Sequence, residues 1–527
     1  MTASELAPPS AGVSISGTTL LLLGLGVATG MEFYTADSMN LVLGDVTGTL
    51  GVSPDEGSWL LTVYSASLFF GVPLSVWLAG HVGYKRFLIA SVLLFAASSV
   101  GCALSPGYGI LLAFRALQGL AGGGLVVWWR AGIYVIFPKS QRSASLMLVS
   151  TMLYLSSALG LILSGVITEE YDWRLLFLPN LAFAAIAVWL LARYFPDVPK
   201  STAARTLKVD WPGIFFLAVS LIALQIVLNR GEVDGWWDDE AIRWLVWASI
   251  VSILAFVVWQ TCPLNDAPLI WLPILRDRRV LSAIPIGVCT GMILSGSLFV
   301  LPEFLRNLSR ITHSASQTGQ LICVYALTAA AVRYAIPGIV ARFGQRMVIA
   351  AALLLLIASM VLFQRCLTTG TPDGYFIAPL MLYGLCLSPL LPSVGSGTVA
   401  RVEGPNVLDA VSVYMTFRTL GASLGVAILS ILLVHRETLH SSRIYESLGA
   451  RGAAAPWLSS AAQLLVARGE SGAPDAMHGA TAILARAATR QAAALSYADT
   501  FTFMAGVGVI GLGFIFFIPP TPPARGK

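Results

Sequence analysis

The sequence predicts an all-α integral membrane protein with about fourteen transmembrane helices and both termini in the cytoplasm. Three observations support this prediction. Of 527 residues, 56% are hydrophobic and only 11% are charged, whereas soluble domains are about 25% charged. About fourteen apolar runs are long enough to cross about 30 Å of hydrocarbon as helices. Lysine and arginine are concentrated in alternate loops between these runs, as is typical of cytoplasmic loops.

The first run follows a short tail, residues 1–16, which lacks the basic region and cleavage site of a signal peptide. That run is therefore expected to be retained as a span. Most later runs are joined by short connections. The expected spans are 17–43, 57–80, 87–105, 109–136, 144–168, 175–195, 212–229, 242–261, 281–305, 316–340, 347–367, 375–400, 410–434 and 499–519.

The charges between the spans predict the orientation. Because cytoplasmic loops carry the excess of lysine and arginine, the basic loops and both chain ends are expected on the cytoplasmic side. The basic loops contain Lys85 and Arg86; Lys139 and Arg142; Lys200, Arg205 and Lys208; Arg276, Arg278 and Arg279; and Arg342 and Arg346. The acidic loops contain Asp45, Asp55 and Glu56; Glu169, Glu170 and Asp172; and Glu232, Asp234, Asp238, Asp239 and Glu240.

One connection, residues 435–498, is much longer than the others and is expected on the outer side. Segments 457–469 and 480–495 have helical periodicity and few helix-breaking residues. They are expected to form a solvated helical hairpin or to lie against the membrane surface. The alternative is an unstructured linker, although long structureless loops are uncommon.

Glu32 and Asp37 are two carboxylates within the first span. A charged side chain at the bilayer centre costs about 2.5–3.5 kcal/mol on insertion scales, so such residues indicate function. Asp37 and Arg115 are expected at a similar depth, where an ion pair would offset the desolvation of both. We expect this pair to couple transport to protons. The alternative is a permanent ion pair that only holds two helices together.

Three further arginines lie within spans: Arg130, Arg333 and Arg418. Arg418 is near the middle of its span, whereas Arg130 and Arg333 either line the pathway or extend to the cytoplasmic interface. We expect Arg130 and Arg418, with Glu32 and Asn40, to line the substrate pathway. Because arginines outnumber carboxylates, amphipathic weak acids are the expected substrates. If Arg130 and Arg333 extend to the interface, no charge preference is expected.

No catalytic motif is present. The sequence has no phosphate-binding Gly-Lys-Ser/Thr loop, no HExxH motif and no plausible nucleophilic triad, so neither catalysis nor ATP-driven transport is expected. The six cysteines are scattered among the spans in neither a disulfide nor a metal pattern. The net charge of +5 arises mainly from short loops, so nucleic acid is not an expected partner. We expect no cofactor or metal and an ion gradient as the energy source.

Several short motifs occur at positions typical of one transporter family. They are Ala36-Asp37-Ser38 with Asn40; Trp77 to Gly83 with Lys85 and Arg86; Phe114-Arg115 with Gln118-Gly119; Trp173-Arg174 with Asn180; Arg418 with Gly421 and Gly425; and His435-Arg436-Glu437 with His440. The chain resembles the fourteen-span drug:proton antiporters of the major facilitator superfamily, EmrB/QacA-type branch, along nearly its whole length. In that family the fourth-span arginine is linked to proton coupling. Gating motifs would be carried by Gly83, Lys85, Arg86, Gly119, Gly160 and Gly165.

The resemblance implies a proton-driven exporter of amphipathic compounds in a bacterial inner membrane, with its substrate site at midplane between two bundles. Expected partners are the small substrate, protons, the lipid bilayer and, as for EmrB-type pumps, a periplasmic adaptor and an outer-membrane channel. The alternatives are export of one endogenous fatty acid or siderophore, and a membrane scaffold or sensor without transport. The implied organisation is a tail at 1–16, a six-helix bundle at 17–195, two inserted spans at 196–280, a second six-helix bundle at 281–519 including loop 435–498, and a tail at 520–527.

Overall fold

The computed structural model describes most of the chain. The expected tail 520–527 and most of the tail 1–16 lie outside the described residues, as do Lys200, Arg205 and Lys208. The described ranges are 15–196, 209–265, 268–270, 272–276, 278–308, 313–399, 406–450, 454–467 and 473–517.

Every predicted span coincides with helix, which confirms the all-α membrane fold. Thirteen helical segments in the described ranges are long and apolar enough to cross a membrane, and the remaining predicted span, 375–400, coincides with α13. The helices are α1 (Ile15–Leu50), α2 (Pro54–Val82), α3 (Tyr84–Ala103), α4 (Tyr108–Ile136), α5 (Lys139–Glu170), α6 (Pro179–Tyr194), α7 (Trp211–Arg230), α8 (Glu240–Thr261), α9 (Arg278–Asn307), α10 (Ala315–Val332), α11 (Ile336–Phe343), α12 (Gln345–Cys366), α13 (Gly374–Val399), α14 (Asn406–Ala450), α15 (Ala454–Ala467) and α16 (Ala473–Phe514).

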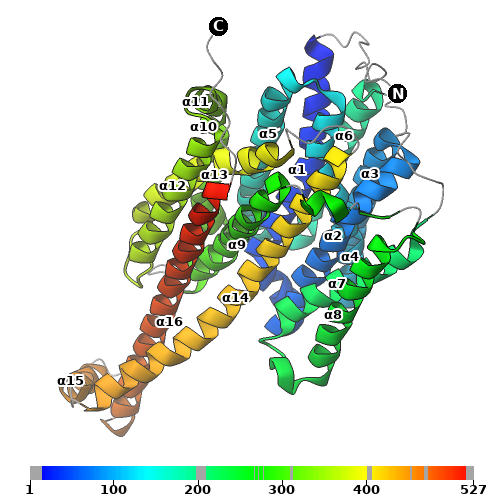
Figure 1. Ribbon diagram of the computed structural model, residues 1–527. Helices are drawn as coiled ribbons and strands as arrows, with labels where there is room; N and C mark the ends of the chain where they lie inside the picture. The colour runs from blue at the N-terminus through cyan, green and yellow to red at the C-terminus, as the bar shows by residue number, and fades with distance from the viewer. Residues whose placement is uncertain are drawn as a thin grey trace, which may run out of the picture.

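Two groups of six long helices share one packing pattern. In the first group α1 packs on α5 and α6, α4 packs on α2 and α3, and α3 packs on α6. In the second group α9 packs on α14 and α16, α13 packs on α10 and α12, and α12 packs on α16. If the helices are numbered one to six along each group, the same numbered helices pack together in both groups. The described helices therefore form two bundles of the same topology, plus α7, α8, α15 and the short α11 (Figure 1).

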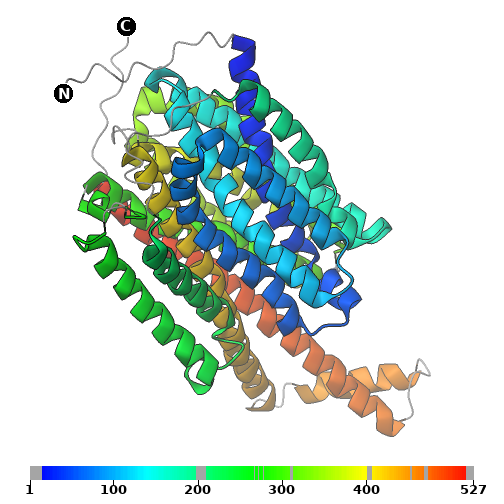
Figure 2. The same ribbon diagram turned by 90° about the vertical axis from the view of Figure 1, so that its right-hand side faces the viewer.

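The two bundles meet asymmetrically. The contact between α5 and α10 is extensive, whereas the equivalent contact between α2 and α14 is smaller. Helix α7 packs against both α2 and α14, so the inserted helices lie along this second seam (Figure 2). We call the end where α1 begins and α16 ends the terminal face, and the opposite end, which carries α15, the hairpin face.

One carboxylate fixes the inserted pair at the terminal face. Asp210 caps the N-terminus of α7 and is 4% exposed. Burial raises the pKa of Asp210, but its hydrogen bonds favour the charged form and leave the pKa below its usual value. Its donors are the backbone N–H groups of Gly213 and Leu269 and the side chains of Trp259, Gln260 and Asn265. The charge thereby joins the start of α7, the end of α8 and the segment after it.

The span predicted at 316–340 is interrupted rather than continuous. Helix α10 ends at Val332, residues Arg333–Ala335 form a 3₁₀ turn, and α11 begins at Ile336. Pro337 lies in the first turn of α11, and proline both lacks an N–H donor and clashes with the carbonyl four residues earlier. The continuous helix is therefore broken at this position, and Arg333 lies at the break.

The described residues of the long connection 435–498 are helical, as the periodicity of 457–469 and 480–495 predicted. Helices α14 and α16 continue well beyond the bundle, and α15 packs against α16 (Figures 1 and 2). At about 1.5 Å per residue, the 45 residues of α14 extend for more than twice the thickness of the hydrocarbon core. His440 contacts Asp499 at 3.0 Å, and the Tyr445 hydroxyl lies 3.4 Å from that of Thr489. These contacts pair the two helices along the protrusion.

Candidate functional site

A large cavity lies between the bundles on the side of α2, α7 and α14. Its volume is about 430 Å³, and its wall includes residues of α1, α2, α4, α5, α7, α9, α10 and α14. Predicted site residues on this wall are Glu32, Asp37, Asn40, Arg115 and Arg418. Arg130 lines a smaller adjoining recess together with Arg418. The structure thus brings the predicted pathway residues together around one space.

Asp37 is connected across the interface between the bundles. The Ser157 hydroxyl of α5 donates a hydrogen bond to the Asp37 carboxylate, and the same hydroxyl lies 2.8 Å from the Tyr325 hydroxyl of α10. Asp37 and Ser157 belong to the first bundle and Tyr325 to the second. A change in the protonation of Asp37 therefore acts on a hydrogen-bond chain that joins the two bundles.

The predicted ion pair between Asp37 and Arg115 is not formed. Arg115 instead donates to the Gln118 side chain at 2.8 Å and to the Leu60 carbonyl at 3.4 Å, and it lies 4.1 Å from the centre of the Tyr64 ring. These neutral groups satisfy the guanidinium without a carboxylate. The expected pairing is wrong for this state of the protein, although both side chains line the same cavity.

Glu32 lies on the cavity wall near Tyr64, whose ring contacts Arg115. Gly122 of α4 faces it closely, since a Cβ built there would lie 3.5 Å from Glu32 Cγ and 3.3 Å from the Tyr64 hydroxyl. Glu32 is also close enough to Arg418 for their charges to interact. The carboxylate therefore lies close to Tyr64 of α2 and interacts with Arg418 of α14.

Arg130 and Arg333 do not extend to the interface. Their exposed fractions are 1% and 0%, so the snorkelling alternative is wrong for both. Arg130 lies over the Trp129 ring and contacts Met415 of α14, while Arg333 donates to the Ser150 hydroxyl of α5. Both arginines therefore bridge the two bundles in the half of the molecule nearer the terminal face.

Three of the predicted gating glycines, Gly119, Gly160 and Gly165, lie at close helix contacts. A Cβ at Gly119 would lie 2.2 Å from the Tyr64 carbonyl oxygen, and one at Gly160 would lie 2.7 Å from that of Tyr34. At Gly165 it would lie 2.4 Å from Ser316 of α10, in the other bundle. Added side chains would force these helices apart. The glycines permit the packing, while their role in gating stays a prediction.

The predicted loop motif forms a tight turn between α2 and α3. Gly83 has a φ of 103°, in the region that favours glycine, and Lys85 and Arg86 follow in the first turn of α3. Gly344 repeats this arrangement between α11 and α12 with a φ of 81°. The same turn therefore occurs at equivalent positions of the two bundles.

Sequence reasoning missed the contribution of α7. Gln225 and Asn229 line the cavity, and Asn229 donates to the Thr62 hydroxyl of α2 at 3.3 Å. The sequence does indicate this contribution, because two polar residues four positions apart in an apolar run lie on one helix face. The count of charges within spans also omitted Glu303, which is half-buried near the end of α9.

Comparisons with known proteins agree with this architecture. The profile of the Major Facilitator Superfamily matches residues 21–306, slightly more than half of the chain. The multidrug export protein EmrB of Escherichia coli K12 is 23% identical over 514 residues, which cover 96% of each chain. The fatty acid resistance protein FarB of Neisseria gonorrhoeae is 24% identical over 444 residues, which cover 84% of this chain and 85% of that one.

A solved structure supports the fold. The human organic anion transporter MFSD10 superposes with a TM-score of 0.59 at 16% identity, covering 94% of this chain and 98% of that one. At this identity the likeness concerns the fold alone. The matched profile and the two equivalent six-helix bundles lead to one conclusion, which the motifs predicted: the chain belongs to the Major Facilitator Superfamily.

Proposed function

We propose that this chain exports amphipathic compounds across a bacterial inner membrane in exchange for protons. The observation that carries the proposal is the cavity between the bundles, whose wall combines apolar side chains with the carboxylates of Glu32 and Asp37. Its volume of about 430 Å³ is within the range of small-molecule pockets, about 300–1,000 Å³. Similarity to the multidrug export protein EmrB supports a broad range of substrates.

The contacts between the bundles support alternating access. Towards the hairpin face, Arg306 of α9 pairs with Asp45 of α1 at 2.9 Å, and Glu169 accepts from the backbone N–H of Ser316 at 2.8 Å. In the half nearer the terminal face, the Tyr154 hydroxyl donates to the Leu387 carbonyl at 2.9 Å. When one bundle rocks against the other, polar contacts at one face must break while contacts at the other face form. A change of charge at the cavity can drive this rearrangement.

Proton coupling is assigned to Asp37, with Arg115 as the cation that faces the same cavity. Protonation would remove the negative charge that accepts the Ser157 hydrogen bond and so weaken the chain to Tyr325. Arg115 stays charged throughout because guanidinium groups do not deprotonate in proteins. Loss of a proton from Asp37 would restore the link and favour the opposite arrangement of the bundles.

The terminal face is assigned to the cytoplasm because it carries the basic turns, including Lys85, Arg86, Arg342 and Arg346. In a cysteine-free background, Ser460→Cys on α15 is expected to react with a membrane-impermeant thiol reagent applied to whole cells. Arg86→Cys is expected to react only after the membrane is permeabilised. Both positions are exposed, so access to the side chain does not limit either reaction. Reaction of Arg86→Cys in intact cells would reverse the assigned orientation.

Export by proton exchange is tested with purified protein in liposomes of known orientation. An acidic compartment on the hairpin face is expected to drive a fluorescent amphipathic amine or acid toward that face, with protons moving the other way. Collapse of the gradient by a protonophore is expected to stop the accumulation. A scaffold or sensor would move neither species, so absence of both fluxes in folded protein would exclude the proposal.

Dedicated export of a fatty acid is the second candidate. It is supported by similarity to the fatty acid resistance protein FarB and by the arginines at the cavity. Growth inhibition of cells lacking and overproducing the protein separates the candidates. Protection against one fatty acid class alone favours dedicated export, whereas protection against chemically unrelated amphipathic compounds favours multidrug export.

A further inference from the structure

A small recess adjoins the large cavity on the side of the terminal face. Its volume is about 20 Å³, which accommodates about one water-sized group. The recess shares four lining residues with the large cavity: Phe33, Val126, Tyr154 and Arg418. A molecule in the large cavity can therefore place one end at the mouth of the recess.

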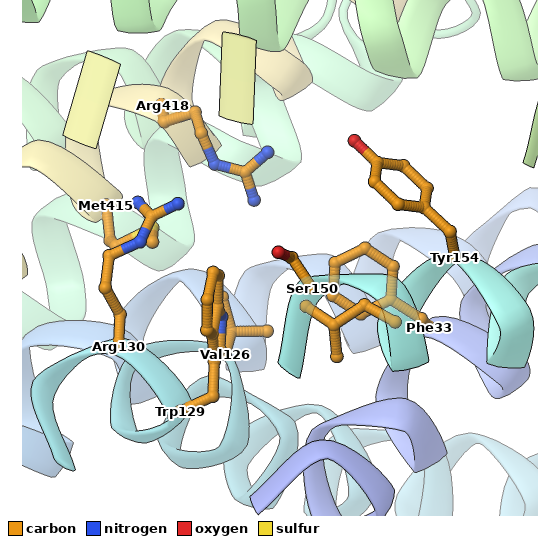
Figure 3. A pocket seen from close by; sticks show the side chains of 9 residues that line it. Phe33, Val126, Trp129, Arg130, Ser150, Tyr154, Met415 and Arg418 are labelled. Carbon is orange, nitrogen blue, oxygen red and sulfur yellow. The ribbon is translucent and has the colours of Figure 1, made fainter. Parts of the chain in front are cut away.

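Three arginines from three different segments converge on this recess. Arg130 of α4 and Arg418 of α14 line it directly, and the Ser150 and Tyr154 hydroxyls of α5 lie across from them (Figure 3). Arg333, at the break between α10 and α11, donates from Nη2 to the Ser150 hydroxyl and lies 5.7 Å from the centre of the Tyr154 ring. Two arginines thus line the recess, and a third is hydrogen-bonded to Ser150 on its wall.

Two of these guanidinium groups have unused donors. Nε and Nη1 of Arg333, and Nε of Arg418, make no hydrogen bond to the described residues although these atoms are buried. A buried polar group without a partner destabilises a protein by about 1–3 kcal/mol, and more when it is charged. The arrangement is therefore unfavourable for folding alone and suited to a ligand that accepts hydrogen bonds.

The balance of charge favours an anion. Among the described residues, none that lines the recess is acidic, and neither Arg333 nor Arg418 forms a salt bridge. The carboxylate that interacts electrostatically with Arg418 is Glu32, on the wall of the large cavity. Arg333 interacts with no acidic group among the described residues, so an anion bound beside it would balance its charge.

We propose that the carboxylate head group of an amphipathic substrate binds at the mouth of the recess, with one oxygen inside it and the apolar body of the substrate in the large cavity. Guanidinium groups bind carboxylates through two parallel, charge-assisted hydrogen bonds, which an ammonium or hydroxyl group cannot reproduce. Arg418 borders both spaces and contacts the head group first, and Arg333 acts from behind the wall through its hydrogen bond to Ser150, which lines the recess. This inference rests on the proposed export function and defines its preferred substrate class as organic anions.

Binding to purified protein tests the recess independently of transport. Three probes share one naphthyl body and carry a carboxylate, a trimethylammonium or a hydroxyl group, and each competes with a bound fluorescent amphiphile. Wild-type protein is expected to prefer the carboxylate over the ammonium at least about 10-fold, as for charge-assisted hydrogen bonds. Arg418→Gln and Arg333→Gln are each expected to weaken carboxylate binding about 10-fold to 100-fold and to change hydroxyl binding much less.

Two further variants separate recognition from structure. Arg418→Lys keeps the charge without the bidentate geometry and is expected to retain part of the carboxylate preference. Arg306→Gln removes an arginine that also joins the bundles but lies outside the recess, and it is expected to leave the head-group preference unchanged. Equal binding of carboxylate and ammonium in wild type, or equal weakening of all three probes in Arg418→Gln and Arg333→Gln, would overturn the proposal.

Measuring both binding and export with the same purified protein distinguishes this inference from the proposed function. Export is measured in liposomes with the carboxylate probe under a proton gradient. A carboxylate preference in binding without any export supports the recess and contradicts the exporter. Export without a carboxylate preference supports the exporter and contradicts the recess.

Discussion

Replacement of Asp37 by asparagine is expected to abolish proton-coupled export while leaving the protein folded. The amide is nearly isosteric and its oxygen can still accept the hydrogen bond from Ser157, but it cannot bind and release a proton. In liposomes under a proton gradient, substrate accumulation in Asp37→Asn is expected to fall to the level of protein-free liposomes. Gradient-independent binding of the substrate is expected to persist.

Matched variants give this experiment its specificity. Asp475→Asn makes the same change at an exposed position of α16, far from the cavity, and is expected to export normally. Tyr325→Phe removes the far end of the hydrogen-bond chain and is expected to slow export without abolishing it. Normal accumulation in Asp37→Asn combined with loss in Glu32→Gln would transfer proton coupling to Glu32, the other carboxylate of α1.

The spans were predictable because the membrane imposes one local rule. Every backbone polar group at membrane depth needs an internal partner, so an apolar run of sufficient length forms a helix. The break at Arg333–Ala335 was not predicted, because the apolar run 316–340 was interpreted as one span and length and hydropathy do not reveal the effect of a proline on the helix. The extension of α14 to Ala450 was also missed, because hydropathy marks where a span leaves the membrane and not where its helix ends.

The site was less predictable because it depends on which helix faces meet. Arg115 and Asp37 were placed at a similar depth, but depth does not reveal that Tyr64 and Gln118 already surround the guanidinium. The small recess is lined by residues of α1, α4, α5 and α14, which are far apart in the sequence. The presence of a charge within a span identified the candidate site residues. Only the packing of the two bundles showed which of these residues lie next to one another.

The helical protrusion of α14, α15 and α16 is proposed to dock a periplasmic adaptor that leads to an outer-membrane channel. Its helices expose large apolar side chains, and such exposure is typical of interaction surfaces. These side chains are Trp457, Leu464, Val466, Met477 and Ile483, each at least 44% exposed. The protrusion extends away from the cavity, so its loss is not expected to alter the substrate site (Figure 1).

Replacing residues 448–486 with a short Gly-Ser linker is therefore expected to abolish drug resistance in cells while the purified protein still binds substrate. The linker joins α14 to α16 next to the contact between Tyr445 and Thr489, so the paired bases of the two helices remain. Leu464→Asp and Ile483→Asp keep the chain length and are expected to lower resistance by disrupting an apolar contact, with Ser460→Asp as the control at an exposed polar position. Unchanged resistance in the linker variant, at normal expression, would exclude a docking role and leave these apolar side chains to contact the membrane surface instead.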